Sequence, residues 1–145
     1  MQEITNSMKI SFPGYSKNES LARICAASFA AQLDPTVEEI NDIKAAVSEA
    51  VTNCIVHAYP DTVGIVDITL RIIGNDTVYI KISDKGKGIA DIEKAMQPLY
   101  TTCPGDERAG LGFAVMESFT DRLRVSSRVG KGTSVTMTKK LRKRI

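Results

Sequence analysis

The fold of this chain is decided by residues 66–88, which read VDITLRIIGNDTVYIKISDKGKG. Apolar residues alternate with polar ones on both sides of Gly74-Asn75-Asp76, a group with turn composition. Alternation with period two predicts two strands, and the short turn between them predicts a hairpin with one buried face. The second strand runs directly into a glycine-rich turn, Asp84-Lys85-Gly86-Lys87-Gly88.

A short strand at residues 8–12 and a first helix are predicted at the N-terminal end. Ser16 and Glu19 have the spacing of a capping box, with Ser16 as the N-cap. Arg23 is expected on the outer face of this helix, toward solvent or a partner. The buried face is expected to hold Leu21, Ile24, Cys25 and Phe29.

A longer second helix is predicted after Asp34-Pro35, which breaks the first. Thr36 and Glu39 repeat the capping-box spacing, and the helix is expected to end near Tyr59-Pro60. Its buried stripe is expected to hold Ile40, Ile43, Val47, Ala50, Val51 and Cys54.

The segment after the hairpin is predicted to form a short helix at 91–96, a loop at 98–112 and a helix at 113–119. A strand containing Leu123 and Val125 follows, and a last strand after Gly130-Lys131-Gly132 turns Val135 and Met137 inward. The strands therefore fall in adjacent pairs instead of alternating with helices. This order predicts an α+β sandwich, a mostly antiparallel sheet with helices on one face.

Length and composition fit one globular domain spanning residues 1–145. Of the 145 residues, 43% are hydrophobic and 25% charged, and the formal charge of +2 gives no field for nucleic-acid or membrane binding. Three widely spaced cysteines fit neither a disulfide framework nor a zinc site, and no apolar run approaches a membrane span. A cytosolic protein is expected. The basic residues of 139–145 are expected to form a solvated, poorly ordered tail.

A polar row on the second helix is the first candidate site. Glu49, Asn53 and His57 are spaced by four, which stacks them along one side of a helix at the border of its apolar stripe. An Asn oxygen suits Mg²⁺, and a Glu one turn away could accept a proton as a general base. The same spacing also fits a solvated helix side with a half-buried histidine.

Two glycine-containing segments are the other candidates. Asp84 at a strand end could accept a hydrogen bond from an exocyclic amine such as that of adenine, and the nearby glycines let a flat ligand approach the backbone. A plain glycine turn with a surface Asp is the alternative. The segment Arg108-Ala109-Gly110-Leu111-Gly112-Phe113 opens a helix, where free N–H groups suit phosphate, although a simple helix entry also explains it. Thr101, Thr102 and Arg108 could then cover a nucleotide as a lid.

The order of these motifs resembles that of the GHKL ATPases, the group of gyrases, heat-shock chaperones, histidine kinases and mismatch-repair proteins. The matching segments are Glu49-Ala50-Val51-Thr52-Asn53, Asp84-x-Gly86-x-Gly88, Gly110-x-Gly112 and Gly132-Thr133. Within that group, residues 97–102, 107–108, 110–113 and 116–121 resemble the anti-sigma-F factors of spore-forming bacteria. The resemblance implies a two-layer GHKL (Bergerat-type) sandwich that binds ATP and Mg²⁺.

The resemblance also implies a role for each matching residue. Glu49 is implied as the base that takes the proton of a partner serine, Asn53 as the Mg²⁺ ligand and Asp84 as the partner of the adenine amine. Arg23 is a candidate contact for a protein partner. Further ATP-binding residues are implied at Gly86, Gly88, Ile89, Thr101, Thr102, Arg108, Gly110, Leu111, Gly112, Phe113 and Thr133. Cys103 and Ala109 depart from the family pattern, where Lys and Ser are usual, and put the lid contacts in question.

The implied activity is that of a serine protein kinase that phosphorylates an anti-anti-sigma factor and, as a homodimer, binds and inhibits sigma factor F. Neither nucleic acid nor membrane is expected as a partner. Three alternatives remain open from the sequence. They are a general ATPase or detached histidine-kinase domain, a stress-response switch kinase for another sigma factor, and a nucleotide-gated sigma-binding module without kinase activity.

Overall fold

A computed structural model describes residues 3–59, 61–89, 91 and 112–142 of the chain. The N-terminal part consists of β1 (Ile4–Pro13), α1 (Lys17–Ala30), a 3₁₀ turn (Ala31–Leu33), α2 (Val37–Asn53) and a π-helical turn (Cys54–Ala58). The remainder consists of β2 (Ile65–Ile73), β3 (Thr77–Asp84), α4 (Gly112–Phe119), β4 (Arg122–Arg128) and β5 (Gly132–Lys140). The helix predicted at 91–96 and nearly all of the loop predicted at 98–112 lie outside the described residues.

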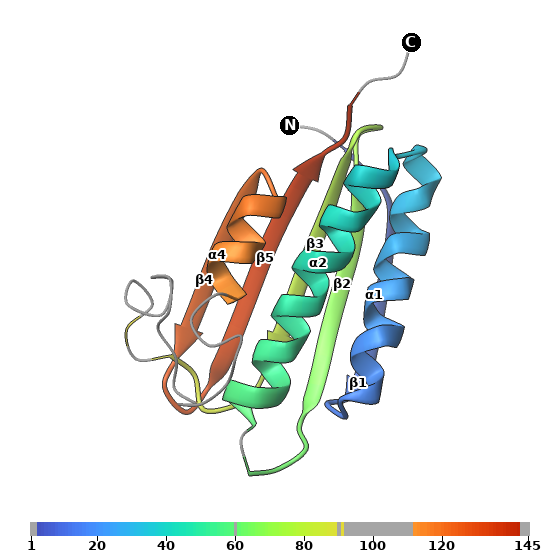
Figure 1. Ribbon diagram of the computed structural model, residues 1–145. Helices are drawn as coiled ribbons and strands as arrows, with labels where there is room; N and C mark the ends of the chain where they lie inside the picture. The colour runs from blue at the N-terminus through green and yellow to red at the C-terminus, as the bar shows by residue number, and fades with distance from the viewer. Residues whose placement is uncertain (1–2, 60, 90, 92–111, 143–145) are drawn as a thin grey trace.

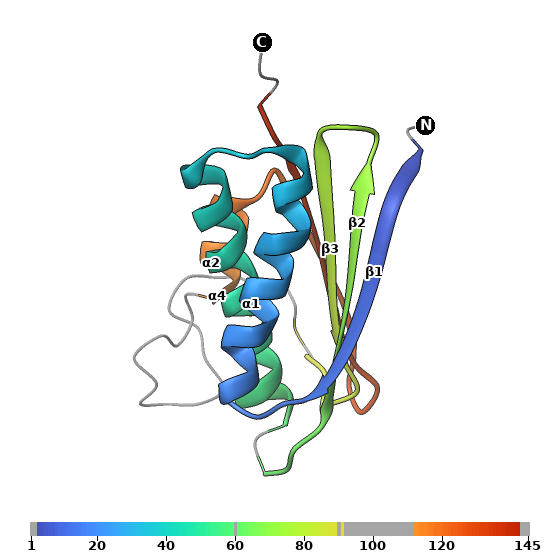
Figure 2. The same ribbon diagram turned by 90° about the vertical axis from the view of Figure 1, so that its right-hand side faces the viewer.

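The strands form one sheet in the order β1-β2-β3-β5-β4, and every neighbouring pair is antiparallel. The helices α1, α2 and α4 lie together on one face of this sheet, as Figures 1 and 2 show. The predicted α+β sandwich with a mostly antiparallel sheet is therefore confirmed. Among the described residues, no helix is both long and apolar enough to span a membrane.

The hairpin of residues 66–88 forms the centre of the core, as its alternation predicts. The inward residues of β2 and β3 are buried, whereas those between them are partly exposed. Val135 and Met137 on β5 are also buried, as predicted. The buried hairpin residues are Val66, Ile68, Leu70, Ile72, Val78, Ile80 and Ile82.

The prediction for the buried face of α1 is wrong in part. Leu21 and Ile24 are 52% and 56% exposed, and of the predicted residues only Phe29 is buried. Small residues take their place, namely Ala22, Ala26, Ala27 and Ala30. Alanine on the inner face lets a helix approach its neighbour closely, so the larger side chains are left on the outside.

The two predicted capping boxes have different outcomes. At Ser16 the backbone is helical (φ −53, ψ −36) and the side chain makes no capping bond, so that prediction is wrong. The Glu19 carboxylate instead accepts a hydrogen bond from the Ser48 hydroxyl of α2. The box at the start of α2 is confirmed, because Glu39 N–H donates to Thr36 Oγ1 (3.0 Å) and Thr36 N–H donates to Glu39 Oε1 (2.8 Å).

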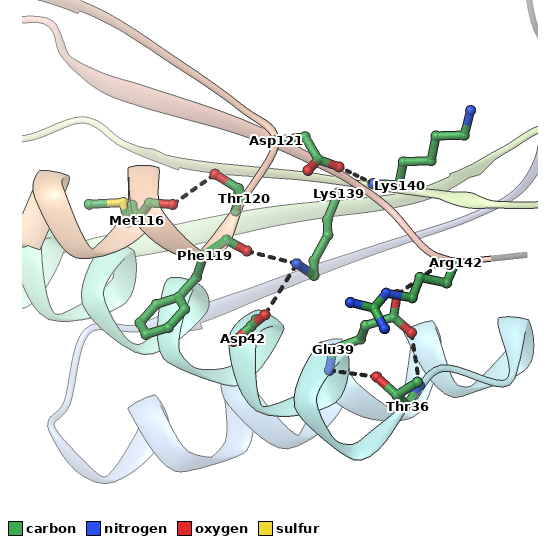
Figure 3. Close-up of polar contacts among 10 residues, drawn as sticks. All are labelled: Thr36, Glu39, Asp42, Met116, Phe119, Thr120, Asp121, Lys139, Lys140 and Arg142. Carbon is green, nitrogen blue, oxygen red and sulfur yellow. Dashed lines mark hydrogen bonds and ion pairs between the residues drawn. The ribbon is translucent and has the colours of Figure 1, made fainter.

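The end of β5 and the residues directly after it, 139–142, are fixed to the helical layer, so that for these residues the predicted solvated tail is wrong (Figure 3). Lys139 Nζ lies 3.3 Å from Asp42 Oδ2 and donates to the carbonyl of Phe119 at 3.2 Å. The N–H of Arg142 donates to Glu39 Oε2 at 2.8 Å. We call Glu39, Asp42, Lys139 and Arg142 the C-terminal clamp. Residues 143–145 lie outside the described part of the chain.

Candidate nucleotide site at the strand ends

The helix-covered face of the sheet changes from apolar to polar at one end of three neighbouring strands. One row across β3, β5 and β4 is apolar and consists of Ile82, Val135 and Val125. Two residues further along each strand, the next inward row consists of Asp84, Thr133 and Ser127. We call this second set the polar row. It brings together Asp84 and Thr133, both of which the resemblance implied as ATP-binding residues.

Asp84 is only 8% exposed, and its carboxylate is held at both oxygens. Oδ1 accepts the N–H of Gly86 (2.9 Å) and the N–H of Thr133 (3.2 Å), while Cys54 Sγ donates to Oδ2 at 3.4 Å. An ionised carboxylate offers about four acceptor positions, so Oδ2 retains capacity for a further donor. Such a fixed, buried acceptor can recognise an amine.

Cys54 and Tyr59 support the Asp84 turn from the end of α2. Burial, with the charge of Asp84 adding to it, raises the pKa of the Cys54 thiol well above its ordinary value. The Tyr59 hydroxyl accepts the N–H of Lys85 at 2.7 Å and donates to the carbonyl of Ile65 at 2.9 Å. Burial is also the main cause that raises the pKa of Tyr59. Both side chains therefore remain protonated hydrogen-bond donors at neutral pH.

The glycines of the turn are required by packing within the chain. A Cβ on Gly86 would lie 2.3 Å from the carbonyl oxygen of Ala58, and one on Gly88 would lie 2.1 Å from that of Arg128. Gly88 also has a positive φ of +77°. These contacts give a reason for glycine that the sequence did not suggest, and the predicted space for a base stays a prediction.

Ser127 is a site residue that sequence reasoning missed. Its Oγ accepts the N–H of Ile89 at 2.8 Å and lies 2.7 Å from Thr133 Oγ1. It thereby connects Ile89 and Thr133, which the sequence analysis gave as ATP-binding residues. A signal was available, because the alternation that turns Leu123 and Val125 inward also turns Ser127 inward.

Glu49 and Asn53 are both half-buried on α2, one turn apart, as predicted. Glu49 lies in an open groove between α1 and α2, whose lining also includes Arg23, Ile24, Lys44 and Ser48. The groove therefore brings together the predicted base and the predicted partner contact. Arg23 is partly held there, because Nη2 donates to Ser20 Oγ at 2.9 Å.

His57, which was predicted to stack with Glu49 and Asn53 along one side of the second helix, lies in the π-helical turn that follows α2. Tyr59 N–H donates to the carbonyl of Cys54, five residues earlier, at 3.2 Å. Single π-helical turns in helices are frequent at functional sites.

The predicted phosphate-binding segment lies mostly outside the described residues. This holds for Thr101, Thr102, Arg108, Gly110 and Leu111, and their roles stay predictions. Gly112 is the first residue of α4, as the prediction of a helix entry requires. Phe113, on the next position, packs against the hydrophobic core.

Comparison with known proteins shows the family to which the chain belongs. The model of the histidine kinase-like ATPase domain matches residues 15–139. The chain is 60% identical to the anti-sigma F factor of Thermoanaerobacter sp. (strain X514), over 94% of this chain and 95% of that protein. The chain belongs to the anti-sigma F factor family. Another member, from Clostridium acetobutylicum, is 53% identical over 94% of this chain and 95% of its own length.

Solved structures show the same fold for this anti-sigma F family chain at low sequence identity. The structure of the RsbU and RsbW domains of Rv1364c from Mycobacterium tuberculosis matches with a TM-score of 0.69 at 22% identity. It covers 94% of this chain and 32% of that one. The catalytic domain of histidine kinase ThkA matches with a TM-score of 0.59 at 15% identity, over 92% of this chain and 96% of that one.

Proposed function

We propose that this chain is an ATP-dependent serine protein kinase of the cytoplasm that phosphorylates an anti-anti-sigma factor and binds and inhibits sigma factor F as a homodimer. The observation that carries the proposal is the 60% identity to an anti-sigma F factor along nearly the whole of both chains. Two features of the structure support it. The polar row contains a buried acceptor that could receive the amine of a base, and Glu49 lies in an open groove that a segment of a partner protein could enter.

The polar row fits the base of ATP. Asp84 is a buried acceptor with capacity left on Oδ2, and its position is fixed by two backbone N–H groups. Thr133, on the adjacent strand, offers a hydroxyl beside it. An acceptor next to a hydroxyl matches an exocyclic amine next to a ring nitrogen, which is the edge that adenine presents.

The phosphoryl group is supplied by ATP, and the chain's own side chains would position it and remove one proton. Asn53 would hold Mg²⁺ through its side-chain oxygen. Glu49 would accept the proton of the partner's serine hydroxyl, and the groove that it shares with Arg23 would admit the partner segment. Residues 108–113 with Thr101 and Thr102 would enclose the phosphates. Because phosphoryl transfer depends on positioning and charge stabilisation, no covalent enzyme intermediate is required.

The deciding experiment is the intact mass of the anti-anti-sigma protein from the same genome after incubation with Mg-ATP and this chain. We expect one added phosphate on a serine with wild type and none with Glu49→Gln. Glu38→Gln, exposed in the first turn of the same helix, is the matched control and should retain transfer. Equal transfer by Glu49→Gln would refute the role of Glu49 as the base.

A second experiment tests the base-binding end alone. Asp84→Asn replaces the carboxylate by an amide, and a hydrogen bond to a carboxylate contributes about 1.5–3 kcal/mol. We therefore expect ATP to bind about 10- to 150-fold more weakly in calorimetry.

If wild type binds sigma factor only with ATP present and transfers no phosphate, the chain is a nucleotide-gated binding module instead of a kinase.

A further inference from the structure

Ser127 lies on the inner face of β4, on the same side of the strand as the apolar residues Leu123 and Val125. Leu123 and Val125 point toward the helices and pack against the core, and Ser127 continues this side of the strand. Arg124 and Ser126 point to the opposite face and are exposed. A polar side chain on the inner face costs stability unless it is hydrogen-bonded, so its contacts are informative.

The Ser127 hydroxyl makes three contacts but has only one proton. It accepts the N–H of Ile89 at 2.8 Å, and it lies 3.0 Å from the carbonyl oxygen of Gly132 and 2.7 Å from Thr133 Oγ1. A carbonyl oxygen can only accept. If Ser127 donates to Gly132, the Thr133 hydroxyl must donate to Ser127. If Ser127 donates to Thr133 instead, the proton of Thr133 is free for another acceptor.

We propose that Ser127 is a positioning residue for the nucleotide base, through the hydroxyl of Thr133 and the backbone of Ile89. When Ser127 donates its hydroxyl proton to Thr133 Oγ1, the Thr133 hydroxyl can donate its own proton to a ligand. This donor lies beside the acceptor Asp84. This pair matches adenine, whose ring nitrogen N1 accepts next to an amine that donates. The inference rests on the proposed function, since it assigns a third residue to the base-binding end of that site.

The test compares ATP with 1-deaza-ATP, in which a C–H group replaces N1 and the amine is retained. Calorimetry on wild type should show ATP binding more tightly than 1-deaza-ATP. In Ser127→Ala the Thr133 hydroxyl loses the hydrogen bond that holds its oxygen in place. We therefore expect ATP affinity to fall about three- to tenfold, which corresponds to one net hydrogen bond, and 1-deaza-ATP affinity to stay unchanged. Ser126→Ala, one residue away on the exposed face, is the matched control and should leave both affinities unchanged.

Two further measurements distinguish a local effect of Ser127→Ala from a general loss of structure. In nucleotide-free protein, the Ile89 amide should exchange its hydrogen faster in Ser127→Ala than in wild type, since it loses its acceptor. In Thr133→Val the preference for ATP over 1-deaza-ATP should disappear, and adding Ser127→Ala should change the preference no further.

The inference and the proposed function fail in different ways. If wild type binds no ATP, the proposed function is refuted and the inference with it. If wild type prefers ATP and Ser127→Ala keeps the same preference, or if Ile89 exchange is unchanged, only the role of Ser127 is refuted.

Discussion

Glu39 connects the start of α2 to the end of β5, and its replacement by Gln tests whether this connection stabilises the fold. Oε1 of Glu39 accepts from the N–H of Thr36 and Oε2 accepts from the N–H of Arg142. A Gln has one carbonyl oxygen and one NH₂ group, so one of the two backbone donors would face another donor. Glu39 is buried, and water therefore replaces the lost acceptor poorly.

The expected loss follows from these two bonds. Hydrogen bonds to charged groups contribute about 1.5–3 kcal/mol, and the Gln oxygen retains one neutral bond, so we expect Glu39→Gln to lower the free energy of unfolding by about 2–3 kcal/mol. For a chain of this size that corresponds to a melting temperature lower by about 5–10 °C. Glu38→Gln, exposed in the same turn, should cost less than about 1 kcal/mol.

The effect should also depend on pH. Burial raises the pKa of Glu39, but hydrogen bonds from Thr36 and Arg142 and the nearby charge of Lys139 outweigh it, so that the pKa lies below its ordinary value. The stabilisation by ionised Glu39 is fully present above the unfolded-state value near 4.5 and is lost as the pH falls through the lower folded value. Thermal unfolding should therefore separate wild type from Glu39→Gln at neutral pH and bring them together in acid. Equal melting of Glu39→Gln and Glu38→Gln at neutral pH would refute the reasoning.

Two further predictions concern groups whose surroundings the structure fixes. Cys54, buried and with a raised pKa, should resist alkylation by iodoacetamide at about pH 8 while half-buried Cys25 reacts, as peptide mass mapping would show; equal rates would contradict the burial of the thiol. Lys139→Met removes the ammonium that bridges Asp42 and α4 and should lower the free energy of unfolding by about 1–2 kcal/mol in urea. Lys140→Met, at a position whose side chain is 70% exposed, should change it by less than about 0.5 kcal/mol, and a similar loss in both variants would count against the bridge.

The sheet and α2 could be predicted because one periodic pattern dominates each of them. The alternation in β2 and β3 leaves a single choice of inner face, and the Thr36–Glu39 spacing matches the capping box that forms. For α1 the pattern was ambiguous. Leu21 and Ile24 suggest one face and the alanines another, and only packing against α2 decides between them.

Residues of the candidate site could be predicted at positions where the backbone conformation or the charge requires one residue type. Asp84 and the glycines after it are recognisable in one continuous segment. Ser127 was missed because serine is ordinary in a strand, and its importance arises only from its pairing with Thr133. The C-terminal clamp was missed for a similar reason. Lys139 and its partner Asp42 are distant in sequence, so a basic terminal segment suggested solvent instead of a contact.

The geometry of the polar row depends on the hydrophobic rows beside it. Asp84, Thr133 and Ser127 belong to three strands, and their alignment requires that Ile82, Val135 and Val125 pair in the same register. A shift of β5 by one residue would turn Thr133 to the uncovered face of the sheet. The clamp opposes such a shift, because Lys139 fixes the far end of β5 to α2 and to the end of α4. The residues of the polar row therefore derive their positions from apolar pairing in the middle of the sheet and from ion pairing at its other end.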